Sequence, residues 1–172
     1  DDWAPSKNTV EEIIMEIKND KVKSDVIVFE GEYRGKKNTR MRVTKFGKKG
    51  VYNKVNYKRK LVFGKTPAHQ ASVFGPSIKQ YTDQFSTKYK LAADLDYFIR
   101  ITGKSDLTVK VIDKVIVNIS DGGVSGREIR LKLKEIQTIY MKHFGQLFII
   151  AIIARYVNKL FDRVQIFDVF KP

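Results

Sequence analysis

Two apolar runs rich in β-branched residues, separated by stretches with helical spacing, most strongly limit the fold of this chain. Asp25–Phe29 is short and almost wholly apolar, which suits a buried strand. Leu107–Ile119 contains two alternating stretches around Asp113-Lys114, and this pattern predicts two short strands or one bent strand. Helical spacing appears at residues 9–19, 94–102 and 125–143. The sequence therefore predicts an α/β fold in which helices flank a mixed sheet.

Local signals indicate where the outer helices begin. Thr9 with Glu12, and Ser125 with Glu128, have the spacing of a capping box, in which a hydroxyl and a carboxylate satisfy free backbone N–H groups. After Thr9, four apolar residues share one helical face: Val10, Ile13, Ile14 and Ile17. The predicted helix over 94–102 turns Leu95, Phe98, Ile99 and Thr102 inward.

The middle of the chain is strongly basic. Residues 33–82 include no aspartate or glutamate but fourteen lysines and arginines, and they account for the whole net charge of +14. Such asymmetry predicts an anionic partner and leaves nucleic acid, a sugar nucleotide and an anionic membrane surface open. The pattern over 31–63 is β-leaning, and 64–90 predicts a loop with a short helix near 77–84. Cysteine is absent, which excludes disulfides and thiolate metal sites.

Three short segments occur in the same order along this chain as in a known protein family. The first is Thr66–Phe74, which contains His69-Gln70; the second is Phe85–Arg100, which contains Ala92-Ala93-Asp94-Leu95-Asp96; the third is Gly122-Gly123-Val124-Ser125. Together they resemble the C-terminal half of bacterial family 2 glycosyltransferases of the GT-A fold. The opening Asp1-Asp2-Trp3 is similar to the acidic metal motif of that family. The likeness covers residues 1 to about 143.

The resemblance implies an inverting sugar transfer from a nucleotide-diphosphate donor to a saccharide or lipid-linked acceptor, in cell-surface polysaccharide biosynthesis. It implies that Asp94 is the general base and that Mg²⁺ or Mn²⁺ is the cofactor. Oxygen ligands suit these ions, which keep one or two protein carboxylates beside the phosphates. The resemblance assigns the metal to Asp2 and Asp1, and substrate contacts to His69, Gln70, Asp96, Gly122, Gly123, Ser125 and Arg127.

The resemblance also divides the chain. Residues 1–143 form a GT-A-like catalytic domain, and 144–172 form an amphipathic helix and tail. In the family a nucleotide-binding half precedes the acidic motif, so that half is expected to be missing here. The helix over 146–161 is expected to pack on the domain or on a second subunit, which leaves a homo-oligomer open, or to touch a membrane through 146–163. The longest apolar run, Leu147–Ala154, is too short to span a membrane, and the expected location is cytoplasmic, extending to the inner face of the membrane.

Two simpler interpretations compete with this assignment. Asp94 has the residue type of an ordinary helix cap. A helix cap also accounts for Ser125 and Glu128 without any bound phosphate. The basic stretch could instead belong to a non-enzymatic nucleic-acid-binding module. Its aromatic residues would stack on bases between cations: Tyr33, Phe46, Tyr52, Tyr57 and Phe63. That interpretation gives Asp94 no role, and the acidic and glycine motifs argue against nucleic acid as the partner.

Overall fold

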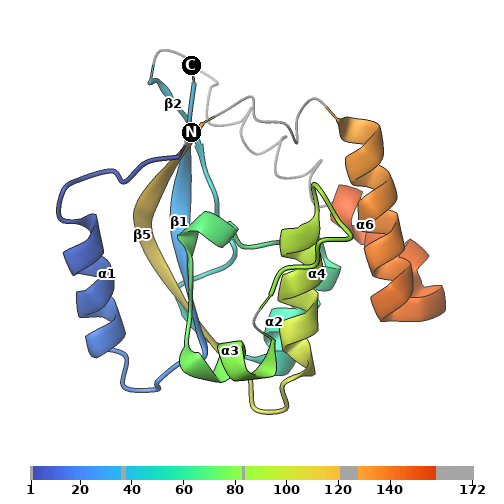
Figure 1. The fold of residues 1–172 in the computed structure, drawn as a ribbon, viewed down its shortest axis with the longest axis horizontal. Coiled ribbons are helices and arrows are strands. Elements are labelled where there is room, and N and C mark those ends of the chain that lie inside the picture. Colours follow the sequence, from blue (N-terminus) through green and yellow to red (C-terminus); the bar gives the residue numbers. More distant parts are fainter. Residues whose placement is uncertain (1, 36–37, 83, 121–127, 158–172) are drawn as a thin grey trace.

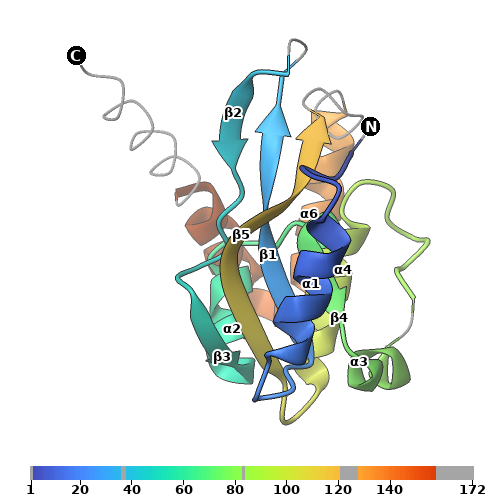
Figure 2. The ribbon, with the colours of Figure 1, turned by 90° about the vertical axis from the view of Figure 1, so that its left-hand side faces the viewer.

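A mixed five-stranded sheet forms the centre of the molecule (Figures 1 and 2). The computed structural model describes residues 2–35, 38–82, 84–120 and 128–157. Strands β1 (Val26–Arg34) and β5 (Thr108–Ser120) lie parallel in the middle of the sheet. Strands β2 (Arg40–Val43) and β4 (Ser72–Phe74) both pair antiparallel with β1, and β3 (Gly50–Asn53) pairs antiparallel with β5. The predicted mixed α/β architecture is therefore confirmed.

Strand β5 is one bent strand, which was one of the two predicted alternatives. Its partner residues on β1 run from Val28, opposite Val111, to Glu30, opposite Val115. Four residues of β5 thus match two residues of β1, and extra residues of this kind bend a strand locally. The bend falls at Asp113-Lys114, where the alternation in the sequence is interrupted.

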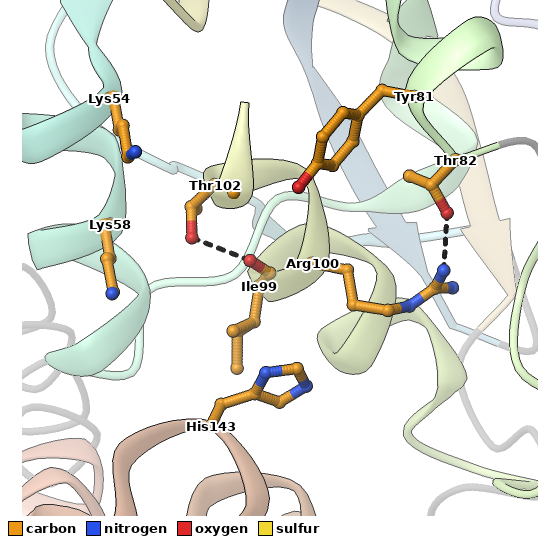
Figure 3. Close-up of a pocket in the computed structure, with 9 residues that line it drawn as sticks. Lys54, Lys58, Tyr81, Thr82, Ile99, Arg100, Thr102 and His143 are labelled. Carbon is orange, nitrogen blue, oxygen red and sulfur yellow. Dashed lines mark hydrogen bonds between the residues drawn. The ribbon is translucent and has the colours of Figure 1, made fainter. Parts of the chain in front are cut away.

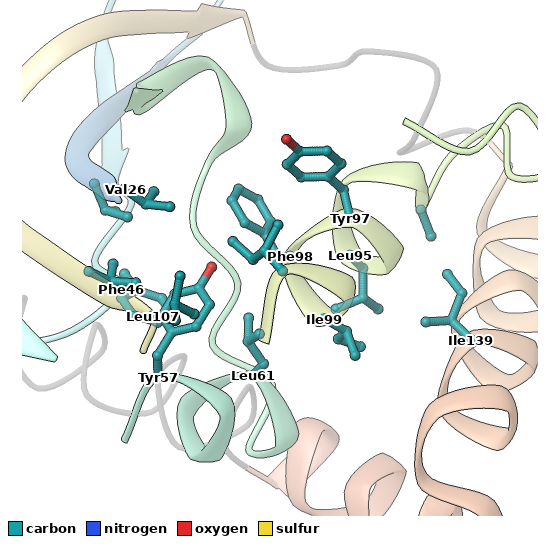
Figure 4. Close-up of a cluster of buried hydrophobic side chains, with 14 of the residues drawn as sticks. Val26, Phe46, Tyr57, Leu61, Leu95, Tyr97, Phe98, Ile99, Leu107 and Ile139 are labelled. Carbon is teal, nitrogen blue, oxygen red and sulfur yellow. The ribbon is translucent and has the colours of Figure 1, made fainter. Parts of the chain in front are cut away.

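Successive residues of β1 face two separate cores, as the two-residue period of a strand requires. Val26 and Val28 point to the larger core and Ile27 and Phe29 to the smaller one. Helices α2 (Lys54–Val62), α4 (Ala93–Arg100) and α6 (Ile129–Phe144) cover the larger core, and α1 (Thr9–Lys18) covers the other face (Figure 1). Figure 4 shows the larger core, where Phe98 and Leu95 of α4 lie between α2 and α6.

Helix α4 confirms the prediction over 94–102. It is followed directly by the 3₁₀ turn η2 (Ile101–Gly103), and Leu95, Phe98, Ile99 and Thr102 are all buried. Helix α3 (Pro76–Tyr81) corresponds to the short helix predicted near 77–84.

The start of α1 differs from the prediction. The residue before the helix is Asn8, and the Thr9 hydroxyl bonds back to the Ser6 carbonyl at 2.9 Å instead of capping the first turn. The predicted apolar face is also largely solvent-exposed, because Val10, Ile14 and Ile17 are 64%, 45% and 43% exposed. Ile13 is the member of that face that packs on the smaller core.

Helix α2 was not predicted, because the segment 31–63 was interpreted as β-leaning. The Asn53 side chain caps it by accepting a hydrogen bond from Asn56 N at 2.9 Å. Tyr57 and Leu61, one turn apart, are fully buried. The prediction failed because these two side chains fix the helix on the core, whereas its other residues are mostly lysine, arginine and asparagine.

After α6, the chain turns through η3 (Gly145–Leu147) and continues as a helix through residues 148–157. The combined helical stretch Ile129–Val157 is long and apolar enough to cross a membrane, judged by length and composition alone. Gly145, with a φ of 55°, interrupts it, and Ile136, Ile139 and Tyr140 are buried in the core. Arg155 fixes the second part to the domain, since its guanidinium donates to the Tyr140 hydroxyl and to Thr66 Oγ1, each at 3.2 Å.

Candidate functional site

A pocket of about 510 Å³ lies near the end of the sheet at which the parallel strands β1 and β5 finish. Ligands of open α/β sheets typically bind at the carboxyl ends of the strands. Asp94 lines this pocket together with His69 and Gln70 from η1 (His69–Ala71), so two of the three recognised sequence segments meet here. The remaining wall is Tyr33, Thr44, Thr66, Pro67, Ala68, Phe85, Lys90, Leu91, Ala93 and Lys132.

Asp94 stands in the first turn of α4 and is half-buried. The cap position belongs to Ala92, which has no side-chain cap, so Asp94 is not the N-cap residue. One carboxylate oxygen, Oδ1, accepts a hydrogen bond from Leu95 N at 2.7 Å. The positive end of the helix dipole favours a carboxylate here. The arrangement holds the Asp94 carboxylate in a fixed position at the wall of the pocket.

The loop that leads into α4 is fixed by Glu135, a residue that the sequence interpretation missed. The carboxylate of Glu135, on α6, accepts hydrogen bonds from the backbone N–H groups of Lys90, Leu91 and Ala92 at 2.8, 2.8 and 2.9 Å. Glu135 is 8% exposed. A glutamate of one helix therefore satisfies the free donors that precede another, and in doing so it sets where Asp94 stands.

Two lysines that the sequence interpretation did not single out also line the pocket. Lys90 lies 3.5 Å from the carboxylate of Glu128, and Lys132 stands on α6, one turn before Ile136. The Lys132 ammonium group gives the wall beside Asp94 a positive charge that favours an anionic ligand, whereas the Lys90 ammonium group is paired with Glu128. The signal that could have identified Lys132 is its place on the same helix face as the buried Ile136.

Asp2 connects the acidic opening motif to the His69-Gln70 segment. Its two carboxylate oxygens accept hydrogen bonds from Gln70 Nε2 at 3.0 Å and from Ser120 N at 3.2 Å. Trp3 pairs antiparallel with Asn118, which anchors this segment to the end of β5. The predicted metal ligand Asp2 and the predicted substrate residue Gln70 are thus in direct contact.

Asp2 fits the part of a single protein ligand to a hard divalent cation. It is exposed, both of its described partners are neutral donors, and each carboxylate oxygen has a further lone pair beside the one used in its hydrogen bond. Within the described residues, no three His, Asp or Glu side chains are grouped closely enough to hold a metal. An ion at Asp2 would therefore take further oxygens from a phosphate group and water, the coordination that Mg²⁺ commonly has.

Asp96 occupies a different environment from Asp94. Its carboxylate is fully buried, 2.8 Å from Arg100 Nε, 2.9 Å from His143 Nε2 and 3.3 Å from Lys142 Nζ. It does not line the pocket around Asp94. The side chain predicted to contact substrate thus joins α4 to α6 in an ion-pair network, because a residue two positions from Asp94 points to another side of the helix.

We expect Asp96 to make stability depend on acid pH. Burial alone would raise the pKa of Asp96, but the hydrogen bond from His143 and the charges of Lys142 and Arg100 together lower it below the ordinary value of 3.8. A lowered folded-state pKa stabilises the protein above pH 3.8, and that contribution is lost as the pH falls below 3.8. Asp96→Asn should lower the free energy of unfolding at neutral pH by about 2–3 kcal/mol, since the cationic partners are partly solvated.

Urea unfolding at a series of pH values measures this difference. The difference in unfolding free energy between Asp96→Asn and the wild type should shrink as the pH falls below 3.8. Asp113→Asn, at an exposed position of β5, should have the same pH dependence as the wild type. A difference that is independent of pH would contradict the role of the charged carboxylate.

Five of the predicted site residues lie outside the described residues, namely Asp1, Gly122, Gly123, Ser125 and Arg127. Because Ser125 is one of these residues, the predicted capping box of Ser125 with Glu128 stays a prediction. Glu128 is the residue that precedes α6.

The aromatic residues proposed to stack on nucleic-acid bases do not form one exposed surface. Tyr57 is 0% exposed and Phe46 is 5% exposed, and their rings pack together in the core with centroids 5.2 Å apart. Both were chosen because they alternate with cations in the sequence, but they are core residues of the basic segment. Phe46 and Tyr57 are not accessible to a base, whereas Tyr33, Tyr52 and Phe63 are not buried.

No protein-family model matches the chain, and no curated protein matches it either.

Proposed function

We propose that this chain is the catalytic part of an inverting glycosyltransferase that moves a sugar from a nucleotide-diphosphate donor to a saccharide or lipid-linked acceptor. The observation that carries the proposal is that Asp94, His69 and Gln70 line one pocket, with Asp2 bonded to Gln70. These residues come from segments far apart in the sequence, and the resemblance to family 2 glycosyltransferases implies a function for each of them.

In the proposed reaction, Asp94 accepts the proton of the acceptor hydroxyl. The oxygen then attacks the anomeric carbon of the donor from the face opposite the diphosphate, and the bond from that carbon to the diphosphate oxygen breaks. The leaving group keeps the bonding electrons, so the configuration at the anomeric carbon is inverted. A positioned base contributes about 10²–10⁴-fold to such a step.

The charge that develops on the diphosphate must be stabilised while it leaves. A Mg²⁺ or Mn²⁺ ion held by Asp2 would act as a Lewis acid, and its positive charge would offset the negative charge on the diphosphate. Lys132 lines the pocket and brings a further positive charge to the same region, whereas the charge of Lys90 is shared with Glu128. His69 is exposed at the pocket, with its ring 6.2 Å from that of Phe85, and we assign it to orienting a substrate.

A lipid-linked acceptor would require contact with a membrane. Exposed apolar side chains follow the second part of the last helix, at Leu147, Ile149, Ile150, Ile153 and Val157. This exposure supports a peripheral contact of the helical segment within 146–163, because apolar side chains of an interfacial helix insert among lipids. The same face could equally bind a second subunit.

Metal-dependent donor binding tests the proposal on the native protein. Isothermal titration with nucleoside-diphosphate sugars should show an affinity at least about tenfold higher in Mn²⁺ than in chelator, and Asp2→Asn should abolish this dependence. Glu11→Gln, which neutralises an exposed carboxylate on α1, is the matched control and should retain it. Tight binding that ignores the metal in both proteins would reject Asp2 as a ligand, and no binding of any donor under any condition would reject the transferase itself.

A further inference from the structure

A second pocket, of about 490 Å³, lies at the opposite end of α4 from Asp94 (Figure 3). Helices α2, α3, α4 and α6 all reach it, together with η2. Because α4 has eight residues, about 12 Å of helix separates its two ends. The second pocket is therefore a separate site from the one assigned to sugar transfer.

Cationic side chains line this second pocket without a carboxylate among its described lining residues. The cations are Lys54 and Lys58, which project from one face of α2, and Arg100 at the end of α4. The imidazole of His143, from α6, also lines the pocket. Figure 3 shows Lys58, Tyr81 and His143 around the same open space. Because the polar side chains of the pocket, including the neutral Tyr81, come from the four helices α2, α3, α4 and α6, their convergence is a property of the fold and not of one lysine-rich segment.

The carboxylate of Asp96, which contacts the lining residues Arg100 and His143, is already neutralised. Asp96 is buried behind the pocket, and the permanent cations Arg100 and Lys142 both lie within 3.3 Å of its carboxylate. Arg100 is further fixed by donating to the Gln84 carbonyl at 2.6 Å and to the Thr82 hydroxyl. Among the described lining residues, Lys54 and Lys58 therefore remain as an excess of positive charge, and the Lys58 ammonium group lies 5.9 Å from the centre of the Phe144 ring.

The position of Lys54 adds an independent argument. It is the first residue of α2, and the first turn of that helix contains no acidic residue. A cation at the positive end of a helix dipole is unfavourable, and a bound anion would offset the repulsion.

A neutral donor completes the pocket. The hydroxyl of Tyr81 points into it (Figure 3), and a Cβ built on Gly103 would lie only 2.0 Å from that oxygen. Gly103 thus permits the Tyr81 ring to lie over the backbone and its hydroxyl to line the same pocket as the two lysines. A phenol and two ammonium groups are suitable donors to a phosphate.

We propose that this second pocket binds a soluble phosphate-bearing small molecule, with Lys54, Lys58 and Tyr81 as direct contacts. Its volume exceeds that of a phosphate group and leaves room for an organic remainder of the size of a sugar. The inference does not depend on the transferase activity, because binding at this pocket is measured without any donor or acceptor.

Inorganic pyrophosphate is the probe, titrated into the native protein at low ionic strength and followed by calorimetry and by the backbone amide signals of Gly103 and Tyr81. We expect saturable binding that shifts both signals. Lys54→Ala/Lys58→Ala should weaken it by at least about tenfold, because hydrogen bonds to charged groups are the strong ones. Lys7→Ala/Lys18→Ala removes the same charge from exposed positions outside the pocket and should change the affinity by less than about twofold.

A charge-neutral variant provides a second test. Gly103→Ala should displace the half-exposed Tyr81 from the pocket and weaken pyrophosphate binding a few-fold without altering net charge. Equal losses in both lysine double variants, shifts confined to the signals of His69, Gln70 and Asp94, or binding only to vesicles that contain phosphatidate would each overturn the proposal.

Discussion

Asp94→Asn is expected to lower the rate of sugar transfer by at least about two orders of magnitude while leaving the protein folded. Asparagine has nearly the same shape and retains an oxygen that can accept the hydrogen bond now made by Leu95 N at 2.7 Å. It cannot accept a proton from an acceptor hydroxyl near neutral pH. Steady-state kinetics on the native enzyme, with donor affinity measured separately, should show a large fall in kcat with little change in donor binding.

The matched control is Asp96→Asn, two residues further along the same helix. Asp96 is buried between Arg100 and His143 and does not line the pocket, so this change should lower stability while transfer by the folded fraction stays near the wild-type rate. Transfer at a wild-type rate in Asp94→Asn would assign the base to another residue.

Glu135→Ala should produce the largest loss of stability of the variants considered. It removes the acceptor of three backbone N–H groups that precede α4, in a part of the structure where Glu135 itself is 8% exposed. Each buried donor without a partner costs about 1–3 kcal/mol, and the loop can recover part of this by admitting water. We expect the free energy of unfolding to fall by about 3 kcal/mol in chemical denaturation.

Two further variants separate the role of the carboxylate from general effects of substitution. Glu135→Gln keeps one acceptor oxygen and should lose about half as much stability. Glu11→Ala, at an exposed position on α1, should change the free energy of unfolding by about 0.5 kcal/mol or less. If Glu135→Ala and Glu11→Ala have equal effects, the three hydrogen bonds do not stabilise the fold.

The sequence correctly predicted elements in which the buried apolar residues repeat at the spacing of that element. Helix α4 was predicted because Leu95, Phe98 and Ile99 repeat at helical spacing, and all three are buried in the core. Helix α2 was missed because two buried residues, Tyr57 and Leu61, give too few repeats to define a period in a nine-residue segment. Its conformation depends on the core that receives those two side chains, and the local sequence does not contain that information.

The candidate site was predictable where a short motif marked it and not where a partner from another element was required. His69, Gln70 and Asp94 were identified from their motifs, and they line the same pocket. Glu135 lies on α6 one turn before the buried Ile139, so its place on the inward face was visible in the sequence. Its partners were not, because three backbone N–H groups of a loop leave no pattern of residue types.

The parallel pairing of β1 with β5 also has a consequence for the folding rate. These two strands form the centre of the sheet, yet residues 35–107 separate them along the chain. Their pairing must therefore close a long loop before most of the sheet can form, and the entropy of that closure is lost before the contacts compensate for it. Proteins dominated by such distant pairings fold slowly. Until β5 arrives, the apolar residues of β1, Val26–Phe29, have no neighbour on one edge, so β1 is exposed to association with other chains during synthesis.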